Sequence, residues 1–186
     1  MKRLFDLIFA LALAVALLAP ALLVALAVKL TSKGPALYWS KRVGQNNVLF
    51  DMPKFRTMKT DTPAVATHLL PDPAKALTPI GSFLRRSSLD EIPQLYSILM
   101  GDMSFVGPRP ALFNQHDLIA LRDASGVSTL RPGLTGWAQV NGRDELSIPD
   151  KVALDESYLT RQGFLFDIKI LGLTFLKVVG QSGVQH

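Results

Sequence analysis

A run of 25 residues, Leu4–Val28, contains a single charged side chain, Asp6, and it limits the possible folds more than any other feature of the chain. A continuous α-helix over this run would be about 37 Å long, which exceeds the roughly 30 Å thickness of the hydrocarbon core of a bilayer. The run is too long for a secretory signal peptide, and no polar region with a small-residue cleavage site follows it. The sequence therefore predicts a segment that enters a membrane.

Two observations favour a helix that bends and leaves the membrane by the face it entered. Pro20 lies inside the run, where proline removes a backbone hydrogen bond and clashes with the preceding turn, at a cost of about 3 kcal/mol. Basic residues flank both ends of the run, and the positive-inside rule places both flanks on the cytoplasmic side. These are Lys2 and Arg3 before it, and Lys29, Lys33, Lys41 and Arg42 after it. From these residues alone, a plain span stays as open as a re-entrant helix with halves Leu4–Ala19 and Pro20–Val28.

The distribution of charge argues against a nucleic-acid partner. The chain has 186 residues and a net charge of +5, of which residues 1–33 carry +3 and the other 153 residues only +2. The excess therefore surrounds the apolar run, where it would meet anionic lipid headgroups. The absence of cysteine excludes disulfides and thiolate chemistry, and the three scattered histidines show no metal-ligand spacing.

The rest of the chain is long enough for one compact domain. Leu37–Val43 and Val48–Phe55 contain aromatic and β-branched residues, and the turn-type sequence between them predicts a β-hairpin. Two later segments, Asp150–Arg161 and Phe164–Val179, have helical patterns. The second is interpreted as a core helix, with contact to a membrane surface as the alternative.

The most informative segment surrounds two adjacent carboxylates. Apolar residues at helical spacing follow Asp90 and Glu91, and Gly101 is a suitable C-terminal stop. Ser88 and Glu91 have the spacing of a capping box, which would place both acids in the first helical turn. Taken alone, acidic residues there only stabilise the helix dipole, by about 0.3–1 kcal/mol.

Arginines nearby change this interpretation. Arg85 precedes the acids, Arg109 is held between two prolines, and Arg143 follows a glycine. Arginine presents a planar fork of donors that matches phosphate, and paired carboxylates suit a divalent metal. The chain has no Walker-type loop and no G-x-G-x-x-G fingerprint, so nucleoside triphosphate hydrolysis and dinucleotide redox chemistry are not expected.

Taken together, these motifs resemble those of the bacterial sugar transferases of the monotopic phosphoglycosyl transferase family. Their order and spacing extend over almost the whole chain. Besides the broken apolar helix, they are Lys54–Met58, Leu84–Arg85, Leu89–Gln94, Gly101–Ser104, Val106–Pro110 and Pro132–Gln139.

The resemblance implies an enzyme that transfers a sugar 1-phosphate from a UDP-sugar to a polyprenol phosphate, expected to be undecaprenyl phosphate, and releases UMP. This is the first membrane step of surface glycan or glycoprotein assembly. By the motif match, Asp90 would be the nucleophile that forms a phosphosugar–aspartyl intermediate, and Glu91 together with Asp90 would hold Mg²⁺. The candidates for phosphate contacts are Arg85, Arg109 and Arg143.

The resemblance also implies an α+β, mostly helical fold. Residues 1–30 would form a re-entrant membrane helix broken at Pro20, where the family often has Ser-Pro and this chain has Ala19 before the proline. Residues 31–186 would form a cytoplasmic catalytic domain with a short β-hairpin and amphipathic interfacial helices. It would lie at the cytoplasmic face of the bacterial inner membrane, with a homodimer as an option.

Two other functions stay open at this point. A magnesium-dependent lipid diphosphate phosphohydrolase would transfer to water and need no polyprenol phosphate. A non-catalytic membrane scaffold would use Asp90 and Glu91 only to cap a helix.

Overall fold

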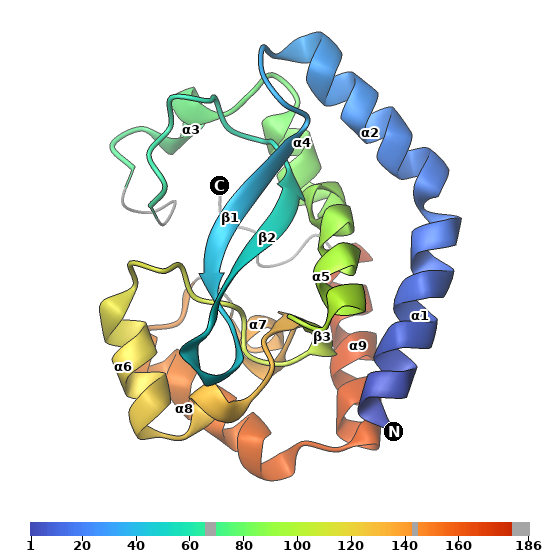
Figure 1. Ribbon diagram of the computed structural model, residues 1–186. Helices are drawn as coiled ribbons and strands as arrows, with labels where there is room; N and C mark the ends of the chain where they lie inside the picture. The colour runs from blue at the N-terminus through green and yellow to red at the C-terminus, as the bar shows by residue number, and fades with distance from the viewer. Residues whose placement is uncertain (66–69, 143–144, 180–186) are drawn as a thin grey trace.

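Helices make up most of the computed structural model, which describes residues 1–65, 70–142 and 145–179 (Figure 1). The helices are α1 (Lys2–Ala16), α2 (Leu18–Thr31), α3 (Pro73–Ala76), α4 (Gly81–Arg86), α5 (Leu95–Met100), α6 (His116–Ala124), α7 (Trp137–Val140), α8 (Ile148–Arg161) and α9 (Phe164–Val179). The predicted α+β, mostly helical class is confirmed, and the helices predicted near residues 150–161 and 164–179 correspond to α8 and α9.

The predicted hairpin is present as β1 (Leu37–Val43) and β2 (Leu49–Phe55), which pair antiparallel along their whole length. Its turn contains a short 3-10 helix with Asn46 and Asn47 in the left-handed region, at φ 54° and 60°. Asparagine tolerates this region because its short polar side chain can bond locally.

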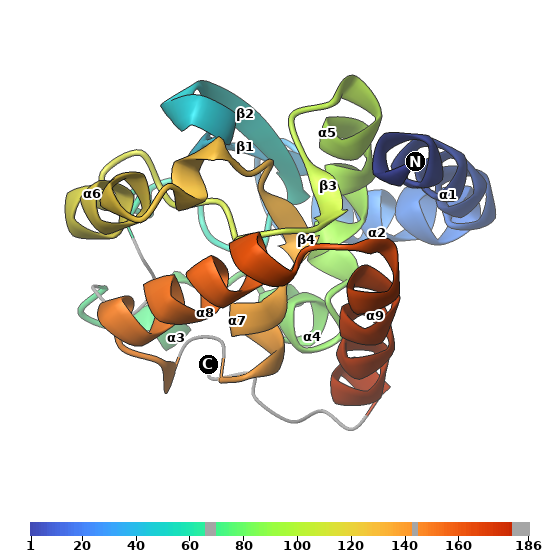
Figure 2. The same ribbon diagram turned by 90° about the horizontal axis from the view of Figure 1, so that it is seen from below.

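A second, parallel pair of strands was not predicted. It consists of β3 (Ser104–Val106) and β4 (Gly133–Thr135), which are only three residues long and therefore show no alternation in the sequence. Seen from below, α1 and α9 lie on one side of this pair and α6 lies on the other (Figure 2).

The apolar N-terminal run forms two helices that meet at a bend of 61°. The bend lies at Leu17 and not at the predicted junction of Ala19 and Pro20. The reason is that the proline ring clashes with the carbonyl four residues earlier, that of Ala16, and that Pro20 has no N–H to donate to it. Taken singly, none of the described helices has the length and hydropathy to cross a bilayer, whereas α1 and α2 together meet both criteria.

Charged side chains attach the start of α1 to the rest of the protein. Arg3 donates to the carbonyl oxygens of Ile98 and Leu99 at 2.5 and 2.9 Å, and Lys2 forms an ion pair with Asp167 at 2.5 Å. The last carbonyls of a helix lack intrahelical donors, so the guanidinium satisfies the end of α5. Lys2 and Arg3 were expected to meet lipid headgroups, but both side chains have a partner within the protein.

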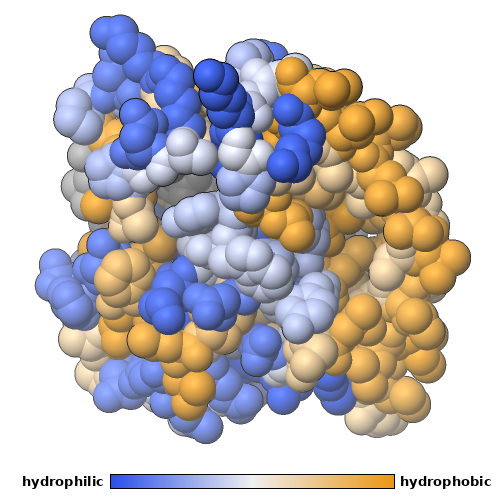
Figure 3. All heavy atoms as spheres, turned by 45° about the horizontal axis from the view of Figure 1, so that its top comes forward, coloured by the Kyte–Doolittle hydropathy of each residue, from blue (hydrophilic) through white to orange (hydrophobic). Residues whose placement is uncertain are grey.

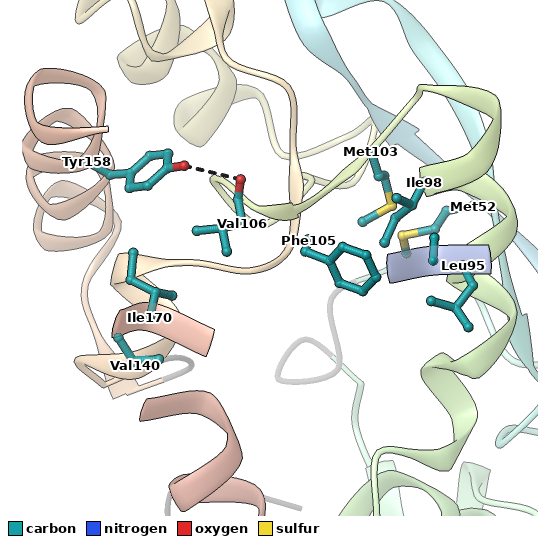
Figure 4. Close-up of a cluster of buried hydrophobic side chains, with 10 residues drawn as sticks. Met52, Leu95, Ile98, Met103, Phe105, Val106, Val140, Tyr158 and Ile170 are labelled. Atoms are coloured by element: carbon teal, nitrogen blue, oxygen red, sulfur yellow. Dashed lines mark hydrogen bonds between the residues drawn. The ribbon is translucent and has the colours of Figure 1, made fainter. Parts of the chain in front are cut away.

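The core lies between α1, α5, β3 and α9. Ala10, Ile98, Met103 and Ile170 are fully buried there, and Figure 4 shows the side chains of β3 between those of α5 and those of α8 and α9. A second cluster packs α2 against β2 and α4, through Val24, Val28, Phe55 and Leu84. Both halves of the bent helix pair therefore contribute to the core of the domain.

The outer faces of α1, α2 and α9 are apolar and exposed, and Figure 3 shows apolar side chains covering one side of the molecule. An exposed apolar surface of this extent is typical of a membrane or protein contact. The predicted core role of α9 holds for one of its faces only, since Ile170 is buried while Leu165 and Phe175 are exposed. The exposed residues of the helix pair include Leu4, Ile8, Leu11, Val15, Leu22, Leu23, Leu26 and Leu30.

We expect Arg3→Met to lower the free energy of unfolding by about 1.5–3 kcal/mol, because two charge-assisted hydrogen bonds to α5 are lost. Thermal unfolding in detergent checks this, with Lys33→Met, which removes an exposed cation after α2, as the control. Equal melting temperatures for the two variants would contradict the attachment of α1 to α5.

Candidate active site

Asp90 and Glu91 lie in a 3-10 helix, η3 (Leu89–Gln94), between α4 and α5. The predicted capping box is wrong: Ser88 adopts a left-handed conformation with φ 55°, and its side chain makes no capping bond. A capping side chain needs an extended backbone, whereas the tight turn out of α4 forces Ser88 into the left-handed region. Both acids do lie in the first turn, and Gly101, at φ 98°, ends α5 as predicted.

Asp90 is surrounded by charged groups although it is only 7% exposed. Burial raises the pKa of its carboxyl above the usual aspartate value, and the neighbouring Glu91 raises it further. The positive charges of Lys54, Arg85 and Arg109 offset part of this effect. The structure therefore brings Asp90 together with three of the predicted site residues and with Lys54.

Glu91 is held between two cations. Its Oε1 accepts from Lys54 Nζ at 3.0 Å and from Arg109 Nη2 at 3.1 Å, and the Glu91 side chain is 14% exposed. Burial lowers the pKa of Lys54, while the carboxylate of Glu91 opposes this shift. This pairing keeps charged groups in place where few water molecules can solvate them.

The motif Lys54–Met58 connects the site to two other elements. Thr57 accepts a hydrogen bond from Arg85 Nε at 3.0 Å, and the guanidinium of Arg56 donates to the carbonyl and hydroxyl oxygens of Ser32 at the end of α2. Lys54 was not predicted as a site residue, although its motif was recognised. Its partner is 37 residues away, so local spacing could not identify the contact.

The loop that carries Arg109 crosses the start of β4 at very short range. A Cβ atom added to Gly133 would lie 2.1 Å from the backbone nitrogen of Gly107, and one added to Gly136 would lie 2.0 Å from the carbonyl oxygen of Gly107. Only glycine permits such a close approach. This explains why glycine occurs at the crossing points of both motifs, at Gly107 in Val106–Pro110 and at Gly133 and Gly136 in Pro132–Gln139.

Arg143, the third predicted phosphate ligand, lies outside the described residues. Gly142 and Glu145, the nearest described residues on either side of it, both line an open pocket.

This open pocket has a volume of about 380 Å³, and both charged and apolar side chains line it. Glu91, Arg109 and Arg86 contribute charged groups to it. Apolar side chains come from α1, from the bend that follows it and from α9, namely Phe9, Leu13, Leu17, Leu171, Phe175 and Val178. Such a wall suits a ligand, or a pair of ligands, that combines anionic groups with a long apolar chain.

The carboxylates fit a metal that is bound together with a substrate. In the described part of the chain, no three His, Cys, Asp or Glu side chains gather into a ready-made site. Mg²⁺ is commonly held by one or two carboxylates, with substrate phosphates and water completing its shell. The adjacent Asp90 and Glu91 meet this requirement.

The family model of the bacterial sugar transferases matches residues 1–181. The chain belongs to this family. The transferase is 40% identical over 186 residues to an uncharacterized sugar transferase, EpsL, of Bacillus subtilis, covering the whole chain and 91% of EpsL. The predicted enzyme class is thereby confirmed.

Two relatives carry more specific names. One is the undecaprenyl-phosphate glucose phosphotransferase of Komagataeibacter xylinus, which is 40% identical over an alignment of 193 residues. The alignment covers 96% of this chain and 36% of that protein. The other is the UDP-glucose:undecaprenyl-phosphate glucose-1-phosphate transferase of Escherichia coli, 38% identical over 186 residues, which cover 95% of this chain and 40% of that protein. The transferase therefore spans less than half the length of these two proteins.

We expect Lys54→Met to raise the pKa of Asp90 further, because the strongest positive charge acting on that carboxyl is removed. A ¹³C NMR titration of the aspartate Cγ signal checks this, with assignment by Asp90→Asn. Lys41→Met, which removes an exposed cation of β1, is the control and should leave the titration unchanged. A pKa of Asp90 that stays constant or falls in Lys54→Met would refute the electrostatic description of the site.

Proposed function

We propose that this transferase moves a sugar 1-phosphate from a UDP-sugar to undecaprenyl phosphate and releases UMP. The observation that carries the proposal is the pair of buried Asp90 and half-buried Glu91 with Lys54, Arg85 and Arg109 around it, beside a pocket with apolar walls. The printed names of the two glucose-1-phosphate transferases support the same reaction type. In this proposal the donor is a UDP-linked hexose or amino sugar.

In the first step, a carboxylate oxygen of Asp90 attacks the phosphorus that bears the sugar. The bond between this phosphorus and the bridging oxygen breaks, and UMP leaves with the electron pair, so an aspartyl phosphosugar forms. A carboxylate needs no general base, but it must approach an anionic diphosphate. The cations Lys54, Arg85 and Arg109 reduce this repulsion in a site of low dielectric constant.

In the second step, a phosphate oxygen of undecaprenyl phosphate attacks the same phosphorus. The bond to Asp90 breaks, and the carboxylate is restored with its electron pair. One phosphoanhydride has then replaced another, so the overall equilibrium lies near unity and UMP drives the reverse reaction. The apolar pocket wall from α1 and α9 is suited to the isoprenoid chain of the acceptor.

Asp90 and Glu91 are the residues that would hold Mg²⁺ in this proposal. When bound, the ion would neutralise charge on the diphosphate oxygens. Arg109 remains on the Glu91 carboxylate, where it can also contact a substrate phosphate.

We propose further that α1 and α2 form a re-entrant helix pair in the cytoplasmic leaflet of the bacterial inner membrane, with residues 31–186 as the cytoplasmic domain. Both ends of the pair are tied to that domain, since Arg3 binds the end of α5 and Arg56 binds Ser32. A helix that crossed the bilayer would separate these two ends by about 30 Å of hydrocarbon. The bend of 61° and the exposed apolar faces support the same placement.

The covalent step predicts isotope exchange without any lipid acceptor. With Mg²⁺, a panel of UDP-sugars and labelled UMP, the wild-type enzyme should incorporate label into its own UDP-sugar, because the first step is reversible. Asp90→Asn should reduce this exchange by about 1,000-fold or more, since no other group replaces the nucleophile.

The matched control is Asp51→Asn, which changes an exposed aspartate of β2 and should exchange normally. Product formation that requires both substrates at once, with no exchange, would indicate direct transfer. Release of sugar phosphate into water in the absence of lipid would instead favour the phosphohydrolase.

The re-entrant arrangement predicts that both ends of the helix pair face the cytoplasm. The chain has no cysteine, so Lys2→Cys and Lys33→Cys each introduce a unique label site. Both should react with a membrane-impermeant maleimide in inside-out vesicles and stay protected in right-side-out vesicles, as should the control Lys41→Cys on β1. Labelling of Lys2→Cys from the periplasmic side alone would show that the helix crosses the membrane.

A further inference from the structure

We infer that Arg122 and Asp155, which lie outside the site described above, position Arg109 for catalysis. Arg122 lies on α6 and Asp155 on α8, and they are 9% and 1% exposed. The described residues that line the 380 Å³ pocket include Arg109 but neither of these two. Arg122 contacts the Arg109 backbone, so the pair would act through Arg109 as positioning residues. The inference rests on the proposed role of Arg109 with the substrate phosphates.

One guanidinium connects the buried carboxylate to the backbone of Arg109. Arg122 donates through Nε and Nη2 to Asp155 Oδ2, at 3.0 and 2.6 Å, and through Nη1 to the carbonyl oxygen of Arg109, at 2.8 Å. A planar guanidinium can serve two acceptors on different edges at once, which the single ammonium of lysine reproduces poorly.

The carbonyls on both sides of Arg109 are also fixed. The oxygen of Pro108 accepts from the backbone N–H of Gly133 at 2.9 Å, and that of Pro110 accepts from Arg42 Nη1 at 3.1 Å. Each of the three consecutive carbonyls thus has a donor, while the two prolines restrict their own φ angles. The Arg109 side chain then reaches Glu91 from a backbone that has little freedom to rotate.

The energetics favour this interpretation over a purely stabilising ion pair. Burial raises the pKa of Asp155, and the nearby charge of Arg122 only partly compensates, so the pair is maintained against a desolvation penalty. Buried ion pairs contribute little net stability compared with apolar replacements. An arrangement of this kind is therefore better explained by the geometry it imposes on Arg109.

The test is a double-mutant cycle with Arg109→Ala. In the wild-type background, Arg122→Lys and Asp155→Asn should each lower kcat/KM for the UDP-sugar by about 10- to 100-fold, because small misplacements of a catalytic group cost that much. In the Arg109→Ala background, the same substitutions should cause no further loss. The dissociation constant of UMP, measured by calorimetry for the same variants in both backgrounds, gives the same comparison without turnover.

Equal fold-losses in both backgrounds, in kcat/KM and in UMP binding, would overturn the inference and leave only a structural role for the pair. Arg122→Lys keeps the positive charge and completes the cycle by itself if Asp155→Asn does not fold. Lys41→Met, at the exposed ion pair with Asp51, is the control and should change neither quantity.

The result separates two kinds of failure. Absence of UMP release by the wild-type enzyme with every UDP-sugar would remove the proposed function, and the calorimetric cycle would still decide the coupling. A wild-type enzyme that is active, with Arg109→Ala equally active and binding UMP equally well, would instead remove the role of Arg109 and this inference with it.

Discussion

The ion triad of Lys54, Glu91 and Arg109 is the contact on which the rest of the structure depends. It joins the β-hairpin, the 3-10 helix η3 and the loop between β3 and α6. The hairpin also meets that loop through the hydrogen bond from Arg42 to the Pro110 carbonyl, and it packs on η3 through Phe55 and Ile92. Charged groups at this depth are costly unless they are paired. Each partner is therefore held where the other two require it, and Asp90 lies beside them in a strongly charged environment.

The backbone around the triad is rigid for reasons that are visible in the sequence only as composition. Gly107, Gly133 and Gly136 allow two chain segments to cross within van der Waals distance of their backbones. Pro108 and Pro110 then limit rotation on either side of the arginine. A loop of this kind orders the Arg109 side chain without a long strand or helix beneath it.

Strong local patterns made much of the fold predictable. The hairpin, α8 and α9 were expected from periodicity and turn chemistry, whereas a break near Pro20 was only one of two alternatives on these grounds. The structure places Asp90 close enough to Glu91, Arg85 and Arg109 for their charges to act on its carboxyl. Contacts between distant residues were not accessible in this way. The strands β3 and β4 are too short to show a pattern, and the capping box failed because spacing does not reveal the backbone conformation of its first residue.

The buried carboxylate of Asp6 has a consequence for the whole N-terminal segment. It is 1% exposed and accepts a hydrogen bond from the backbone N–H of Phe105, at 3.3 Å, on the strand that leads to Arg109. A buried carboxylate would be costly in a helix that only anchors a protein in lipid. Here it has a hydrogen-bond donor on β3, so it fixes the position of α1 against that strand. The apolar segment is thus an integral layer of the catalytic fold, and a foreign hydrophobic helix of equal length would be no substitute for it.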